Sequence, residues 1–131
     1  MTLAFDTSVI IDIQKKNEKT IKKIEELSLR HQEPTPMLFM VYTEFKRGLY
    51  KRSKKLQEEI EIWFEELPFL APTKRTAEII VGLREKYDKK GEPIPLADLI
   101  IASQIKEKEL ILVTKDKIFN KIEEIQKIII E

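Results

Sequence analysis

The stretch LAFDTSVIID, residues 3–12, joins a short apolar run to an acid and then to a helical pattern. The run over residues 3–5 predicts a buried strand that ends at Asp6. Thr7 or Ser8 can cap a short helix directly after it, in which apolar side chains recur at helical spacing. A buried strand followed at once by an acid and a helix is typical of α/β folds, where functional groups gather at the carboxyl ends of parallel strands.

The remainder of the chain repeats this alternation of strands and helices. Continuous apolar runs predict strands over residues 37–41, 110–113 and 128–130, with an extended segment over 68–72. Apolar periodicity predicts helices over residues 18–30, from Thr43, over 54–66, from Thr73 and over 96–107. In the helix that starts at Thr73, we expect Ala77, Ile80, Val81 and Tyr87 to face inward. The predicted fold class is α/β: one domain over residues 1–131, with a central parallel sheet of four to five short strands and helices on both faces.

Composition limits the chemistry that this chain can perform. There are 131 residues, the size of one domain, and 24 Lys and Arg against 23 Asp and Glu give a net charge of +1. Any affinity for nucleic acid must therefore come from local patches of charge. The absence of cysteine and the single histidine exclude disulfides, thiolate zinc sites, cysteine nucleophiles and a site of several histidines. Carboxylates, hydroxyls, Lys and Arg must carry the chemistry.

The expected location is the cytoplasm, with no membrane partner. The first residues lack the basic start and cleavage site of a signal peptide, and no apolar run approaches the ~20 residues of a membrane span. Abundant Lys, Glu and Ile without Cys resemble the composition of thermophile proteins.

Four acids stand out from the many on solvated helix faces. Asp6 and Asp116 each follow a predicted strand, and Glu44 follows the 37–41 run at the start of the next helix. Asp98 lies in the most apolar helix, where a charge is costly unless it is paired or binds a cation. Each acid taken alone has an ordinary alternative as a helix cap or turn residue. Several carboxylates without His or Cys suit Mg²⁺ or Mn²⁺, and such sites support reactions of phosphodiesters.

The motifs around these acids resemble those of the PIN-domain family, and within it the VapC-type toxins of toxin–antitoxin pairs. In chain order the similar segments are FDTSVIID at residues 5–12, TEFKRG at 43–48, PLADLIIAS at 95–103 and LVTKDKIF at 112–119. The resemblance implies a metal-dependent endoribonuclease, in which water activated by Mg²⁺ or Mn²⁺ cleaves RNA. It implies a catalytic and metal-binding cluster made of Asp6, Glu44, Asp98 and Asp116.

The same resemblance implies further roles and a protein partner. Asp6 and Asp98 are the expected direct metal ligands, and Ser8 and Thr114 are expected to support the cluster by orienting a carboxylate or a water. A cognate antitoxin is expected to place a basic side chain, Arg in particular, among the four carboxylates. The sequence departs from the family pattern in two places. Phe45 stands where Leu is commoner, and the fourth acid is an Asp where Asn is frequent.

Basic residues near two of the motifs predict contacts with RNA phosphates. Six positive residues and no negative one lie between residues 46 and 55, and two lysines flank Asp116. The expected RNA-binding residues are Lys46, Arg47, Lys51, Arg52, Lys115 and Lys117. Such contacts position RNA without selecting a sequence, and solvated helix faces are the alternative. Tyr42 and Tyr50 are expected to pack in a core or interface rather than to stack on bases.

Bulky apolar residues on and after the 54–66 helix, namely Trp63, Phe64 and Phe69, favour a homodimer. The sequence leaves three other functions open: a stand-alone PIN nuclease for RNA processing, a PIN fold that only binds, and a phosphoacceptor receiver domain. A receiver would need adjacent acids after its first strand, but Thr7 follows Asp6. It would also need an acceptor Asp after a middle strand, and the 37–41 run ends without one.

Overall fold

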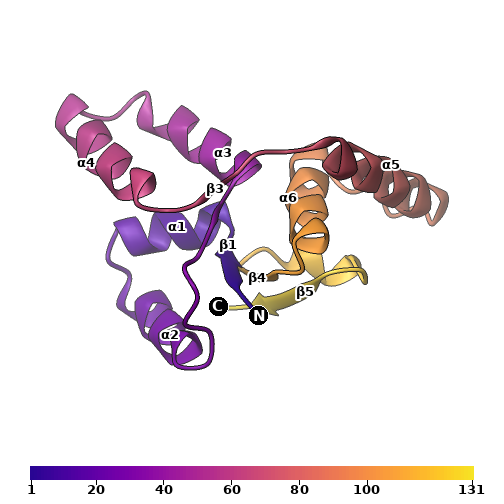
Figure 1. Ribbon diagram of the computed structural model, residues 1–131, viewed down its shortest axis with the longest axis horizontal. Helices are drawn as coiled ribbons and strands as arrows, with labels where there is room; N and C mark the ends of the chain where they lie inside the picture. Colours follow the sequence, from indigo (N-terminus) through magenta and orange to yellow (C-terminus); the bar gives the residue numbers. More distant parts are fainter.

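The computed structural model describes residues 1–131. It has five strands, six α-helices and one short 3-10 helix, η1. In chain order they are β1 (Leu3–Phe5), α1 (Thr7–Gln14), α2 (Glu18–Ser28), β2 (Met37–Leu38), α3 (Phe39–Leu49), α4 (Lys54–Glu65), β3 (Phe69–Leu70), α5 (Lys74–Lys89), α6 (Leu96–Glu107), β4 (Ile111–Thr114), η1 (Lys117–Lys121) and β5 (Gln126–Ile129) (Figure 1). The predicted α/β class and its alternation of strands and helices are confirmed.

All the strand pairs are parallel, and they form two sheets instead of one. The larger sheet has the order β1-β4-β5, and the smaller one pairs β2 with β3. In the larger sheet Leu3 lies opposite Ile111 and Thr114 lies opposite Ile129. The carboxyl ends of β1 and β4 are therefore neighbours, and the residues that follow them meet at one edge of the sheet.

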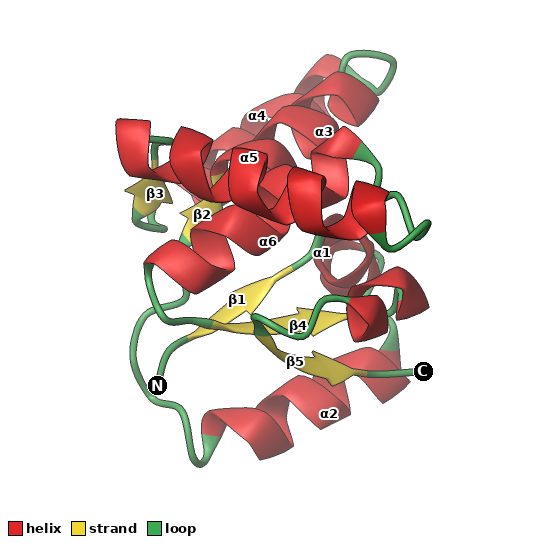
Figure 2. Ribbon diagram, turned by 90° about the vertical axis from the view of Figure 1, so that its right-hand side faces the viewer, coloured by secondary structure: helices red, strands yellow, loops and turns green.

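Helices cover both faces of the larger sheet, as the sequence predicts. Alternate side chains of a strand point to opposite faces. Ala4 and Leu112 accordingly belong to the main core, while Leu3 and Ile111 belong to a second, smaller cluster. Figure 2 shows α2 below the sheet and α5 and α6 above it. None of these helices is long and apolar enough to span a membrane.

The expected strand over residues 37–41 is wrong beyond Leu38. The chain turns into α3 at Phe39, because the Phe39 backbone N–H donates to Oε1 of the buried Gln104, at 3.0 Å, instead of extending a sheet. The Gln104 Nε2 donates in turn to the Leu70 carbonyl of β3, at 2.9 Å. As a result β2 has two residues only, and Glu44 lies in the middle of α3 rather than near its start.

Two details at the helices also differ from the sequence prediction. Asp6, rather than Thr7 or Ser8, is the N-cap of α1, since its carboxylate accepts the Thr7 backbone N–H at 2.8 Å. In α5 the buried residues are Thr76, Ile79, Leu83 and Tyr87, so that Tyr87 alone of the expected inward residues is buried. Val81, expected inside, is 62% exposed.

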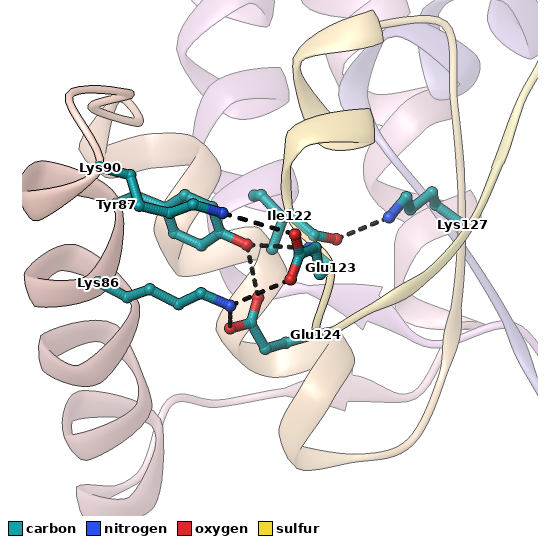
Figure 3. A network of polar contacts seen from close by, with 7 residues as sticks. All are labelled: Lys86, Tyr87, Lys90, Ile122, Glu123, Glu124 and Lys127. Carbon is teal, nitrogen blue, oxygen red and sulfur yellow. Dashed lines mark hydrogen bonds and ion pairs between the residues drawn. The ribbon is translucent and has the colours of Figure 1, made fainter.

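A polar network fixes the end of α5 to the segment between η1 and β5 (Figure 3). The hydroxyl of the fully buried Tyr87 donates to Glu124 at 2.7 Å and accepts the Glu123 backbone N–H at 2.9 Å. Lys86 also donates to Glu124, at 2.7 Å, and Lys127 donates to the Ile122 carbonyl at the same distance. These bonds hold the chain against α5 just before it enters the edge strand β5.

Candidate active site

Asp6 is the most buried of the four candidate acids. It leaves the end of β1, and its carboxylate accepts hydrogen bonds from the Thr7 backbone at 2.8 Å, from the Thr114 hydroxyl at 2.6 Å and from Ser8 at 3.5 Å. Burial raises the pKa of Asp6, and the charge of Asp116 adds to this effect, whereas the hydrogen bonds oppose it. The result is a fixed carboxylate that a positive charge would stabilise.

Thr114 connects Asp6 to the loop that carries Asp116. It is the fully buried last residue of β4, and its hydroxyl donates to Asp6 while accepting the Asp116 backbone N–H at 3.0 Å. The Asp116 carboxylate caps η1 by accepting the Ile118 N–H at 3.0 Å, and the side chain is exposed. The parallel pairing of β1 with β4 thus places the first and fourth motifs together.

Glu44 reaches the same site from α3, and a residue that the sequence did not single out as functional holds it there. The Thr7 hydroxyl donates to the Glu44 carboxylate at 2.7 Å, and so links the first turn of α1 to the middle of α3. Both residues are partly buried. Thr7 follows Asp6 directly, so one short stretch orients two of the four acids.

Asp98 lies in the first turn of α6 and is partly buried. Burial, and then the charges of Asp116, Asp6 and Glu44, raise the pKa of Asp98 to about 6. All three other acids therefore lie close enough to Asp98 to resist its ionisation. A raised carboxylate pKa with specific charge partners is typical of a functional site.

The four carboxylates share one electrostatic site without forming a closed cage. No three Asp, Glu or His side chains converge closely enough to make a preformed metal site. Mg²⁺ commonly binds through one or two carboxylates and keeps several waters, so its requirements differ from those of a structural metal. The donor set is oxygen only and carries excess negative charge, which fits Mg²⁺ or Mn²⁺.

A groove of about 170 Å³ leads away from this site between α1 and α3. Its lining includes Thr7 and Ile11 of α1, Lys15 directly after α1, Glu44 and Gly48 of α3, and Arg52 in the turn after α3. The groove therefore borders two residues of the acidic site and two basic residues. Phe45, Leu49 and Leu56 supply further apolar lining.

The other predicted RNA-binding residues have mixed surroundings. Lys46 pairs with Glu61, and Lys115 pairs with Asp12 at 2.9 Å, so both charges have partners within the chain. Arg47, Lys51 and Lys117 are exposed.

The two tyrosines differ in their packing. Tyr42 packs on Phe64 and Phe69, as expected. Tyr50 is 88% exposed, so it does not pack in the core of this chain, and its packing in an interface stays a prediction.

The largest groove of the molecule, about 540 Å³, lies elsewhere. Its lining includes Met37, Tyr42, Phe64 and Phe69, and none of the four candidate acids. Carboxylates with perturbed pKa values are the stronger indication of chemistry, and they mark the end of the β1-β4 pair instead.

Sequence reasoning missed three residues that contact the site or its surroundings, namely Thr7, Asp12 and Lys15. The positions of Thr7 and Lys15 can be found by drawing α1 as a helical wheel, because residues 7, 11 and 15 share a face. Asp12 had no such signal, since its partner lies 103 residues away.

The fold and the acidic site define an α/β domain with four mutually interacting carboxylates, three of them close to the carboxyl ends of β1 and β4 or joined to them by Thr7. The chain belongs to the PIN domain family, whose model matches residues 3–125. This membership also sets aside the receiver-domain alternative. No curated protein sequence matches this chain significantly.

Solved structures of VapBC complexes share the fold over almost the whole chain. The chain is similar to one in VapBC2 of Rickettsia felis bound to a promoter DNA fragment, with a TM-score of 0.86 and 20% identity over 100% of both chains. It is also similar to one in VapBC-1 of nontypeable Haemophilus influenzae, with a TM-score of 0.83 and 25% identity over 98% of both chains. For VapBC-5 of Mycobacterium tuberculosis, a member of the VapBC family of toxin–antitoxin systems, the TM-score is 0.73 with 17% identity over 99% of this chain and 100% of that one.

Proposed function

We propose that this protein is a Mg²⁺- or Mn²⁺-dependent endoribonuclease and the toxin of a toxin–antitoxin pair. The observation that carries the proposal is the mutual effect of the four acids, through which Asp116, Asp6 and Glu44 help to raise the pKa of Asp98 to about 6. Like charges are brought together at such a cost where a cation neutralises them. Membership of the PIN domain family supports nuclease chemistry at this site.

Asp6 and Asp98 would hold the cation. Both have raised pKa values in its absence, so both gain most from an adjacent positive charge. Glu44, oriented by Thr7, and the more exposed Asp116 complete the negative site. A bound Mg²⁺ supplies Lewis acidity toward a phosphodiester and lowers the pKa of water. Thr114 and Ser8 keep the Asp6 carboxylate aimed by donating hydrogen bonds to it.

The groove between α1 and α3 supports single-stranded RNA as the substrate. It is lined by Thr7 and Glu44 of the acidic site and by two cations, Lys15 and Arg52. Cations in a groove that borders the proposed hydrolytic site suit a phosphate backbone bound at that site. Such contacts fix the position of the strand without selecting its sequence.

The proposed toxin role rests on the structural relatives. The matching chains come from VapBC complexes, and one of these is described as a toxin–antitoxin system. An antitoxin would also explain how a cell tolerates an unspecific nuclease. A stand-alone RNA-processing nuclease is the outcome to infer if no such partner exists.

Cleavage of single-stranded RNA by the purified, partner-free chain tests the nuclease function. We expect cleavage with Mg²⁺ or Mn²⁺, loss of cleavage with a chelator, and recovery when metal is restored in excess. Absence of cleavage of every RNA tried, with both metals, would contradict the proposal.

Single substitutions test the metal ligands. Asp6→Asn and Asp98→Asn are expected to remove activity while a cooperative thermal transition persists. Glu85→Gln is the matched control, since Glu85 is an exposed acid on α5 outside the site. Wild-type cleavage by either Asn variant would overturn the assignment of that residue.

A further inference from the structure

An ion pair outside the acidic cluster connects α1 to the loop after β4. Lys115 Nζ lies 2.9 Å from the Asp12 carboxylate, which also accepts the Thr20 hydroxyl of α2 at 2.6 Å. The side chain of Asp12 is 14% exposed and that of Lys115 is 34% exposed. The pair is thus more sheltered than the other ion pairs of the chain, in each of which at least one side chain is 39% exposed or more.

Lys115 is attached to α1 a second time through its backbone. Its N–H donates to the Ser8 hydroxyl at 3.3 Å, and the same hydroxyl lies 3.5 Å from the Asp6 carboxylate. Side chain and backbone of this one residue are therefore both held by α1. Without the ion pair, one 3.3 Å bond would be left to fix the backbone of Lys115 to that helix.

The residues on either side of Lys115 belong to the acidic site. Thr114 donates to Asp6, and Asp116 is one of the four acids. The strand hydrogen bonds of β4 end here, with Ile130 N–H donating to the Thr114 carbonyl at 2.8 Å. After Thr114, the position of Asp116 is fixed by two hydrogen bonds of its own, from its N–H to the Thr114 hydroxyl and from the Ile118 N–H to its carboxylate. It is also fixed by the contacts of Lys115 with α1.

We propose that Asp12 and Lys115 form a positioning pair that sets the Asp116 loop against Asp6. The inference rests on the proposed nuclease function, which it deepens. Its consequence is that Lys115 acts inside the protein and is not an RNA contact, in contrast to the sequence prediction. Partly exposed ion pairs contribute little to the free energy of unfolding. We therefore expect loss of the Asp12–Lys115 pair to change the geometry of the acidic site rather than the global stability.

A double-mutant cycle on the full chain tests the pair through Asp12→Asn, Lys115→Met and the combined variant. We expect each single variant to lower kcat about tenfold with KM within twofold of wild type, because displacing a catalytic group by about 1 Å can cost as much as ~10²-fold. The double variant is expected to lose no more than either single one, and Lys115→Arg to restore activity. Asp88→Asn, which breaks the surface pair with Arg84, is the matched control with unchanged kcat.

Each alternative role gives a different result in this cycle. A raised KM with unchanged kcat in Lys115→Met would make Lys115 an RNA contact and overturn the inference. Additive losses would show two independent roles, and wild-type kcat in Asp12→Asn would remove the positioning role; both outcomes also overturn it.

Hydrogen exchange measures the same coupling without any catalysis. We expect Asp12→Asn to speed amide exchange at Lys115 and Asp116 at least fivefold, with exchange in α5 unchanged. Unchanged exchange at Lys115 and Asp116 would overturn the inference. This readout keeps its meaning in a protein that cleaves no RNA, so failure of the nuclease proposal and failure of the positioning pair are distinguishable.

Discussion

The Thr7 hydroxyl of α1 donates a hydrogen bond to the Glu44 carboxylate of α3 at 2.7 Å, and the two residues are 37 positions apart in the chain. Glu44 lies in the middle of α3, so neither a helix N-terminus nor a strand end fixes its direction. The Thr7 backbone N–H meanwhile donates to Asp6. Thr7 therefore aligns two acids of the site at once, one through each of its polar groups.

Replacing Thr7 should separate these two roles. Thr7→Val keeps the backbone bond to Asp6 and removes the hydroxyl from Glu44. A hydrogen bond to a partly exposed charge is worth about 1 kcal/mol, so we expect a loss in kcat of about fivefold. Thr7→Ser keeps a hydroxyl and is expected to retain most of the activity. Steady-state cleavage of a labelled RNA measures both variants, and equal rates for Thr7→Val and wild type would contradict the role.

The contribution of Asp98 to the stability of the metal-free protein should fall as pH rises through the acid range. The native pKa of Asp98 is about 6, against the ordinary 3.8, so the native state binds more protons than the unfolded state between these values. This contribution of Asp98 is therefore greatest below about pH 4 and is lost as pH rises to about 6. Asp98→Asn removes this penalty, and at pH 7 we expect it to be more stable by about 1 kcal/mol, a value reduced to allow for the partial exposure of the carboxylate.

Urea unfolding in chelator at pH 4 and pH 7 measures this difference. The gain of Asp98→Asn over wild type should be present at pH 7 and nearly absent at pH 4. Mn²⁺ should then stabilise wild type more than the variant, since ligands that bind only the native state raise its stability. An equal gain at both pH values would show that charge repulsion is not its cause.

Gly48 should respond differently from a second helical glycine in α5. A Cβ added at Gly48 or at Gly82 meets no atom within 4 Å, and glycine within a helix costs about 0.5–1 kcal/mol relative to alanine. Both Gly48→Ala and Gly82→Ala should therefore raise the melting temperature. Gly48 lines the groove that leads from the acidic site, so only Gly48→Ala should raise KM for RNA. Similar KM values for the two variants would argue against RNA in this groove.

A partner protein should bind across the four carboxylates. We expect an antitoxin segment to place an Arg guanidinium among them, because its planar donors match carboxylates and its charge replaces that of the cation. Co-expression with the product of a small neighbouring gene, followed by cleavage assays, checks this, and substitution of that Arg in the partner should restore cleavage. Failure of every such product to bind would favour a stand-alone nuclease.

The isolated chain is expected to form a homodimer. Phe64 is buried within the chain, but Phe69 is 49% exposed and Ile62, on α4, is 64% exposed, which leaves bulky apolar surface near α4. Light scattering measures the mass in solution. A strictly monomeric chain at high concentration would contradict this expectation.

The sequence predicted those parts of the fold that local patterns determine. Residues 3–5 and the helix from Leu96 to Glu107 lie where their apolar patterns place them. The strand prediction over residues 37–41 was wrong beyond Leu38, because an apolar run fits a buried strand and a buried helix equally well. A distant side chain decides between the two. The Gln104 side-chain oxygen accepts the Phe39 N–H and so ends the strand, and no residue near Phe39 in the sequence predicts that contact.

In the candidate site, too, some features follow from local sequence patterns and others depend on distant residues. Asp6 and Asp116 follow strands that pair in parallel, so their common location follows from topology alone. The roles of Thr7 and Asp12 depend on partners 37 and 103 residues away, which single-sequence periodicity does not connect. A helical wheel of α1 could still have placed Thr7 and Lys15 on the face that meets α3.

The pairing of β1 with β4 also governs when the site forms during synthesis. The hydrogen bond from Thr114 to Asp6 spans 108 residues, so the first acid emerges from the ribosome long before its partner exists. Closing so long a loop is entropically costly, and folds rich in such distant contacts fold slowly. A nascent chain that stops short of β4 therefore carries the first three acids but lacks the strand that brings them their fourth. Under the proposed nuclease function, the complete acidic site would form only after β4 has been synthesised and has paired with β1.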